Sequence, residues 1–316
     1  MPSPGLIDVH AHFVTDSYTA AARAAGIDHP DGMPGWPEWS AQNHLDLMER
    51  TGIDKSYLSL SSPGVHFGDD AQARSLAREL NDFAHALHAD RPRRFGHFAC
   101  LPLPDIDGAV AEARYALDVL GADGVVVETN HRGMYLGDRR LDALWQVLDD
   151  RAALVFVHPT SPPHAEEVAL GRPRPMVEFI FDTARTAADL VFRDVLTSRP
   201  RIRWVLTHCG GALPVLADRM EMFHQALATQ DQPGVVQQLS QLWYDIAGTP
   251  FPHQVPALRA AFGTTRTLYG SDYCWTSADA VERQVRSIDQ APSSATGDTW
   301  RELTTANADR LLDPSS

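Results

Sequence analysis

Two histidines one residue apart, His10 and His12, lie in the first apolar run of the chain, L-I-D-V-H-A-H-F at residues 6–13. Side chains alternate faces along a β-strand, so both imidazoles point toward the same surface. Imidazole is a common ligand of transition metals, and this pair supplies half of a zinc site. Two ligands alone do not hold a zinc ion, so the alternative is a pair of half-buried strand histidines bonded to backbone carbonyls. Further ligands at the ends of later strands decide between the two interpretations.

Further imidazole and carboxylate groups stand where later apolar runs end. His158 ends A-L-V-F-V-H, His208 follows R-W-V-L-T, and Asp272 lies in Y-G-S-D after the last run. Each has an ordinary alternative, such as a turn-forming role for Asp272. A catalytic zinc ion takes about three protein ligands and keeps one position for water. The joint pattern predicts a metal site with the ligands His10, His12, His158 and Asp272. Other polar residues at predicted strand ends are Ser61, Glu128, Asn130 and Asp245.

Eight predicted strands alternate with predicted helices along the chain. The strands are expected at residues 6–13, 55–61, 94–101, 123–128, 153–158, 202–208, 242–247 and 266–269. The helices are expected at residues 44–51, 71–89, 107–120, 141–151, 178–197, 213–229, 256–262, 278–289 and 300–312. Near-continuous apolar strands such as D-G-V-V-V-E are typical of parallel sheets covered by helices on both faces.

This alternation predicts an α/β fold, a (β/α)8 TIM barrel. The chain has 316 residues, somewhat more than the roughly 250 typical of such barrels. A doubly wound open sheet is the alternative, but no G-x-G-x-x-G follows the first strand and the sequence contains no P-loop. We predict a single domain over residues 1–316, with loop insertions after the first and fifth strands at residues 14–43 and 159–177. Active sites of TIM barrels lie at the carboxyl ends of the strands, where the candidate ligands fall.

Composition excludes several classes of partner. The formal net charge of -14 argues against binding to nucleic acid or to an anionic membrane, because both need a basic surface. The three cysteines are far apart, so neither a disulfide framework nor a cysteine-rich zinc site is indicated. The first strand begins at residue 6, which leaves no room for a signal peptide, and no apolar run is long enough to span a membrane. We expect a soluble cytoplasmic protein.

The motifs H-A-H, V-H-P, T-H-C-G-G-A-L-P and Y-G-S-D-Y resemble those of the amidohydrolase superfamily. Within it they are similar to the aminocarboxymuconate-semialdehyde decarboxylase-like branch, whose H-x-G-G-x-x-P signature appears in full at residues 208–214. The resemblance covers essentially the whole chain, and residues 181–191 look most like decarboxylases of the 6-methylsalicylate and resorcylate type. It implies a TIM barrel whose catalytic histidine is His208 and whose metal ligands are His10, His12, His158 and Asp272.

The resemblance also implies how a substrate is held. Arg219 matches the position of an arginine that contacts the substrate carboxylate in relatives. Some relatives supply a second arginine from the loop after the first strand, but residues 36–45 contain none, which favours an aromatic ring with one carboxylate. Trp39 and Trp275 are candidates to stack on such a ring, and Glu128 is a candidate wall residue.

The resemblance also bears on the type of metal centre and on the oligomeric state. Binuclear amidohydrolases bridge two metals with a carboxylated lysine after the fourth strand, whereas the only lysine here is Lys55, at the start of the second strand. That binuclear arrangement is excluded. Three imidazoles and a carboxylate suit Zn²⁺, with Mn²⁺ possible as well. We expect no organic cofactor, and a homodimer or homotetramer as in members of the branch.

These inferences combine into a hypothesis of non-oxidative decarboxylation of an o-hydroxybenzoate-like acid. Asp272 is the first choice of proton donor to the ring carbon, His208 orients or relays the proton, and Arg219 holds an anionic group. A mechanism in which metal-bound hydroxide first adds to the substrate uses the same residues. The alternative function is hydrolysis of a lactone or amide of a small carboxylated ring, with Asp272 as base. A third hypothesis, a catalytically silent binding barrel, does not require the complete ligand set.

Overall fold

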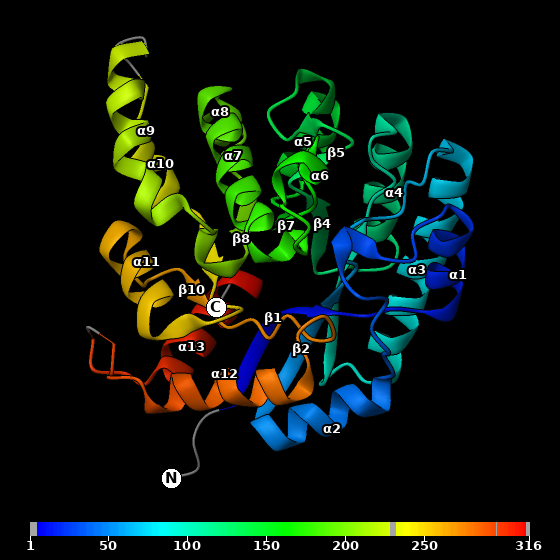
Figure 1. Cartoon of the computed structure of the whole chain (residues 1–316), viewed down its shortest axis with the longest axis horizontal. Helices are drawn as coiled ribbons and strands as arrows, with labels where there is room; N and C mark the ends of the chain where they lie inside the picture. Colours follow the sequence, from blue (N-terminus) through cyan, green and yellow to red (C-terminus); the bar gives the residue numbers. More distant parts are fainter. Residues whose placement is uncertain (1–4, 228–231, 295, 314–316) are drawn as a thin grey trace.

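A computed structural model describes residues 5–227, 232–294 and 296–313. Eight strands form one parallel sheet, and its first and last strands meet where the Val9 amide donates to the Tyr269 carbonyl at 3.0 Å. Helices surround this sheet, so the predicted TIM barrel is confirmed (Figure 1). In sheet order the strands are β1 (Leu6–His12), β2 (Ile53–Ser59), β3 (Phe95–Cys100), β4 (Gly124–Glu128), β7 (Leu154–His158), β8 (Arg203–Leu206), β9 (Trp243–Asp245) and β10 (Thr267–Leu268).

Seven of the main helices connect successive strands of the sheet, the last two follow the final strand, and each buries one apolar face. These main helices are α2 (Ala41–Thr51), α3 (Asp70–Asp90), α4 (Ile106–Asp118), α5 (Asp142–Asp150), α7 (Glu178–Phe192), α9 (Leu213–Leu227), α11 (Val255–Phe262), α12 (Ala278–Gln290) and α13 (Trp300–Leu312). The other helices are α1 (Asp16–Ala24), α6 (Ala165–Val168), α8 (Val195–Ser198) and α10 (Val235–Leu239). No helix in these ranges is long and apolar enough to cross a membrane.

The barrel interior is filled by side chains, as a closed eight-stranded barrel requires. The rings of Phe98 and Phe156 stack with centroids 5.4 Å apart. Phe156 in turn meets the ring of His10 edge-on, with 5.1 Å between centroids. The ring of His10, one of the candidate metal ligands, therefore packs directly on the apolar interior of the barrel.

The segment after β1 contains a helix where we predicted only a loop. Residues 14–43 hold α1, whose N-cap Thr15 accepts a hydrogen bond from the Tyr18 amide, and whose Tyr18 and Ala22 are buried one turn apart. The Gly, Pro and Trp residues that suggested a loop begin only at residue 26, and the alanine-rich stretch before them favours helix. α2 also begins three residues earlier than predicted, because Ser40 caps it.

Other boundaries differ in ways that have local causes. The helix predicted at 178–197 divides into α7 and α8, because Asp194 adopts a left-handed conformation with φ of 60°. The segment at 159–177 carries α6, and a hairpin of β5 (Asn130–His131) and β6 (Met134–Tyr135) follows β4. Neither α6 nor the hairpin was predicted, because a four-residue helix and two-residue strands are too short to leave a periodic pattern. The predicted helical residues 228 and 229 lie outside the described ranges.

Candidate metal centre and active site

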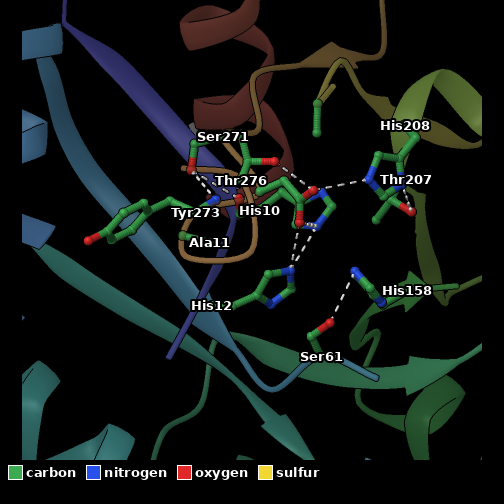
Figure 2. A network of polar contacts seen from close by, with 12 residues as sticks. His10, Ala11, His12, Ser61, His158, Thr207, His208, Ser271, Tyr273 and Thr276 are labelled. Carbon is green, nitrogen blue, oxygen red and sulfur yellow. Dashed lines mark hydrogen bonds and ion pairs between the residues drawn. The ribbon is translucent and has the colours of Figure 1, made fainter. Parts of the chain in front are cut away.

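The four predicted ligands converge at the carboxyl ends of three strands. His10 and His12 lie on β1, His158 ends β7, and Asp272 follows β10. One ligand atom from each lies within 4.8 Å of those from the other three. The Nε2 atoms of His10 and His12 are 3.0 Å apart, and the Asp272 carboxylate is 3.4 Å and 3.3 Å from them. Figure 2 shows His12 and His158 pointing toward each other across this centre.

Each imidazole is oriented by a hydrogen bond from its other nitrogen. The Nδ1 of His10 lies 2.9 Å from an Asp245 oxygen, that of His12 lies 3.2 Å from the Ser59 carbonyl, and that of His158 lies 2.7 Å from the Pro159 carbonyl. These acceptors place the proton on Nδ1 and leave the Nε2 lone pair directed at the centre. Such an arrangement fits a divalent metal, which needs deprotonated nitrogens.

Electrostatics differ among the three imidazoles. Burial lowers the pKa of both His12 and His158, so these two are neutral and able to bind a metal. Burial opposes protonation of His10 as well, but the Asp245 carboxylate outweighs it and raises the pKa of His10 to about 10. A metal ion at this centre would therefore displace the Nε2 proton of His10 when it binds. Burial also acts against ionisation of Asp272, yet its bonds to the surrounding imidazoles hold its pKa well below the usual range.

Two buried carboxyl groups, Asp8 and Asp245, connect the ligands to the scaffold. Asp245 ends β9 and accepts the backbone amides of His208 and Ala247, both at 2.9 Å, besides orienting His10. Asp8 accepts the backbone amides of His10 and Ser271, which joins β1 to the segment after β10. From the sequence, Asp245 was predicted only as a strand-end residue, without this role, and Asp8 was not identified. The signal was available, because Asp8 shares a strand face with both β1 histidines.

His208 is placed by an unusual turn after β8. Residues 208–211 all have positive φ, and a Cβ on Gly211 would lie 2.3 Å from the Ile180 carbonyl oxygen. Only glycine fits there, which explains the paired glycines of the motif. The turn brings Nε2 of His208 to 3.6 Å from Asp272 Oδ2, which also accepts from the Thr276 hydroxyl at 3.0 Å. Figure 2 shows His208 facing the same centre as the metal ligands.

A pocket of about 350 Å³ opens over this centre. His158, His208 and Asp272 form its polar end, and Phe179, Ile180 and Met176 are among its apolar walls. Two polar atoms that line it, Trp275 Nε1 and Gln254 Oε1, are buried and have no hydrogen-bond partner in the described part of the chain. These two atoms are therefore available to a bound molecule. Gln254 was missed by the sequence analysis.

The structure brings Trp275 into this pocket but not the other predicted substrate residues. Trp39 donates to His44 at 3.2 Å and packs on Phe13, outside the pocket lining. Glu128 lines a neighbouring cavity. Arg219 lies in a groove between α7 and α9, where its guanidinium covers the Phe223 ring at 5.3 Å.

Comparison with known proteins agrees with the geometry. The amidohydrolase family profile matches residues 7–313. The 6-methylsalicylic acid decarboxylase acuB of Aspergillus aculeatus is 32% identical over 318 residues, covering 97% of this chain and 95% of that protein. A solved amidohydrolase II is 33% identical, with a TM-score of 0.92 over 98% of this chain and 99% of its own.

A more distant structure carries a metal. A dihydroxybenzoic acid decarboxylase from Polaromonas, with bound manganese and the inhibitor 2-nitroresorcinol, is 21% identical, with a TM-score of 0.83 over 99% of this chain and 98% of its own. At that identity the likeness shows a common fold. The profile match and the relatives above 30% identity cover nearly the whole chain. This chain belongs to the amidohydrolase family.

Proposed function

We propose that the protein is a metal-dependent, non-oxidative decarboxylase of a small aromatic acid with a hydroxyl group beside its carboxylate. The observation that carries this proposal is the convergence of three imidazoles, Asp272 and His208 at the end of a pocket sized for one small ligand. A relative that spans the whole chain is named for decarboxylation of 6-methylsalicylic acid, an acid of this class.

His10, His12, His158 and Asp272 would hold the metal, for which we propose Zn²⁺ or Mn²⁺ because the donor set suits both. Manganese is the metal in the Polaromonas structure. When bound, the ion supplies Lewis-acid stabilisation of the anionic substrate. The uniformly buried imidazoles exclude water from their side of the pocket, which strengthens that stabilisation. No organic cofactor is part of the proposal.

Asp272 and His208 are the proposed proton-transfer pair. The oxygen of Asp272 that faces His208 also faces the pocket wall at Thr276, so one proton can move between His208 and Asp272 at this point. Asp272 delivers it to the ring carbon that carries the carboxylate. The bond between that carbon and the carboxylate then breaks, its electron pair restores the aromatic ring, and carbon dioxide leaves.

We propose a homo-oligomer, a dimer or tetramer, because α7 and α9 expose a contiguous set of apolar side chains. Phe181 is 48% exposed, Phe223 46% and Val215 77%. Phe181 and Phe223 line one groove with Arg219. Exposed patches of this kind are typical of interfaces. Arg219 lies on this face and not in its own metal pocket. Its predicted contact with a substrate carboxylate therefore requires a second copy of the chain.

We propose a cytoplasmic location. All three cysteines are free and buried, which fits a reducing compartment. The expectation that neither nucleic acid nor membrane is a partner rests on the net charge of -14.

The test is mass spectrometry of products after incubation of the metal-loaded protein with 6-methylsalicylate, 2,6-dihydroxybenzoate and small aromatic lactones. We expect an acid to lose the mass of carbon dioxide with wild type and with Asp46→Asn, an exposed control on α2, but not with Asp272→Asn. Gain of the mass of water on a lactone, without loss of carbon dioxide from any acid, would identify a hydrolase instead.

A further inference from the structure

A second cavity, of about 520 Å³, lies beside the metal pocket at the same end of the barrel. It is formed over the ends of β2, β3 and β4, and the β5–β6 hairpin and residues 160–164 close its sides. None of the four metal ligands lines it, nor does His208. Its volume falls in the range of small-molecule sites.

Glu128 ends β4 and supplies an unsatisfied acceptor to this cavity. Its side chain is 7% exposed, and its Oε2 has no hydrogen-bond partner in the ranges that the structure describes. The Nδ1 of His158 is 3.8 Å away and already donates to the Pro159 carbonyl at 2.7 Å. A buried carboxyl oxygen without a partner is costly to the folded protein. Its presence in a cavity wall indicates a ligand that donates a hydrogen bond.

His131, on β5, contributes a second unsatisfied atom. Its Nε2 is buried and has no partner among the described residues, and the ring lines the same cavity. Burial lowers the pKa of His131 to about 3, so the imidazole is neutral. A neutral imidazole nitrogen exchanges a hydrogen bond with a hydroxyl group without bringing charge into the cavity.

The remaining walls are mostly apolar. Leu60, Val65, Phe67, Leu101 and Val126 all face the cavity. The basic side chains of the lining are poorly placed to bind an anion. Arg132 is exposed, His66 already contacts Asp70 at 2.8 Å, and His164 contacts Glu167 at 3.1 Å. An anionic ligand would lose its hydration beside the Glu128 carboxyl. The lining therefore favours an uncharged molecule with an apolar ring and a hydroxyl group.

A thin polar wall separates this cavity from the metal pocket. The hydroxyls of Ser62 and Thr160 lie 2.6 Å apart, and Ser161 donates to Asp31 at 2.5 Å. Ser62 and Asp31 line the metal pocket, whereas Thr160 and Ser161 line the second cavity. Decarboxylation of a hydroxybenzoate consumes an anion and releases a neutral phenol. The metal pocket suits the first molecule, and the adjacent cavity suits the second.

We propose that the second cavity is a binding site for a neutral phenol, whose hydroxyl donates to Glu128 and whose ring packs on the apolar walls. That this phenol is the enzyme's own product rests on the proposed function, whereas the chemistry of the site does not. A phenol held there leaves the metal pocket open to substrate. Added phenol should therefore not compete with the acid for the metal pocket.

The test uses 3-methylphenol, which is what 6-methylsalicylate leaves on losing carbon dioxide. Calorimetric titration should give the same Kd, within about twofold, for the metal-loaded and the chelator-stripped protein. Glu128→Ala and His131→Ala should each weaken binding about tenfold, the effect of one buried hydrogen bond. Glu79→Ala, an exposed control on α3, should leave the Kd unchanged. Benzoate should bind the stripped protein at least about tenfold more weakly than the phenol, because it brings a charge.

A crystal soaked with 3-bromophenol locates the site without any substitution, so a variant that fails to fold does not weaken the test. We expect anomalous bromine signal between Glu128 and His131. Signal confined to the metal pocket, loss of phenol binding on metal removal, or wild-type binding by a folded Glu128→Ala protein would each overturn the proposal. Phenol binding is measured without turnover, so absence of decarboxylation would refute the proposed function and leave this site standing.

Discussion

Replacing Asp245 by Asn tests how the scaffold prepares His10 for a metal. One Asp245 oxygen accepts the backbone amides of His208 and Ala247, and the other accepts from His10 Nδ1 at 2.9 Å. In Asp245→Asn the amide oxygen must stay with the two backbone donors. The new NH₂ group then faces His10 Nδ1, where two donors would meet.

The imidazole can relieve this conflict only by moving its proton to Nε2. That change removes the lone pair of His10 from the metal centre. Loss of an orienting carboxylate typically weakens metal binding 10–100-fold. This substitution also selects the wrong tautomer. We therefore expect the loss of metal affinity to lie at the upper end of this range, about 100-fold or roughly 2.7 kcal/mol. Activity at limiting metal should fall in parallel.

The assay is competition for Zn²⁺ or Mn²⁺ against a chromophoric chelator at fixed pH. Asp123→Asn is the matched control. Asp123 also accepts a backbone amide, that of His97 at 2.9 Å, but it lies at the amino end of β4, whereas the ligands lie at the carboxyl ends of the strands. We expect the control to bind metal as wild type does. A folded Asp245→Asn protein whose metal affinity stays within about threefold of wild type would refute the tautomer argument.

Three further outcomes are expected. Chelation should abolish turnover, and Zn²⁺ or Mn²⁺ should restore it; activity in rigorously stripped protein would contradict the metal site. Gln254→Leu, which removes the unpaired acceptor in the metal pocket, should raise KM for a polyhydroxylated acid about tenfold more than for a monohydroxylated one; equal changes would exclude this contact. Burial lowers the pKa of His44 and His131 to about 3 from 6.5, so the unfolded chain binds more protons in acid and stability falls below pH 6.5. Urea denaturation should show a loss of about 2 kcal/mol per histidine between pH 7 and pH 5; a flat profile would contradict it.

The convergence of the candidate metal ligands could be predicted from sequence because strand geometry is local. His10 and His12 share a face through the two-residue repeat of a strand, and any residue that ends a parallel strand of a barrel comes to the same rim. The two glycines after His208 were noted from the sequence only as part of a family signature. The structure supplies the physical reason, which is the positive φ of both glycines and the close approach of the Ile180 carbonyl to Gly211.

The placement of Arg219 could not be predicted in this way. It lies six residues into α9, about 9 Å along the helix axis from Leu213 at 1.5 Å per residue. Sequence spacing gives that distance but not the direction in which α9 leaves the barrel. The helix carries Arg219 away from its own pocket, toward the exposed apolar groove beside α7. Only the packed structure reveals this.

The surroundings of Glu128, at the carboxyl end of the barrel, could not be predicted from the sequence either. It ends a strand, as His158 does, and the two are register partners on adjacent strands β4 and β7. The loops that carry Ser62 and Thr160 nevertheless divide the rim between them, and this contact joins residues 98 positions apart in the chain. One side of that wall gathers imidazoles around Asp272, and the other leaves a single carboxyl unpaired among apolar side chains. Strand ends thus determine which residues reach the barrel mouth, while long-range loop contacts determine which of two chemically different cavities each residue serves.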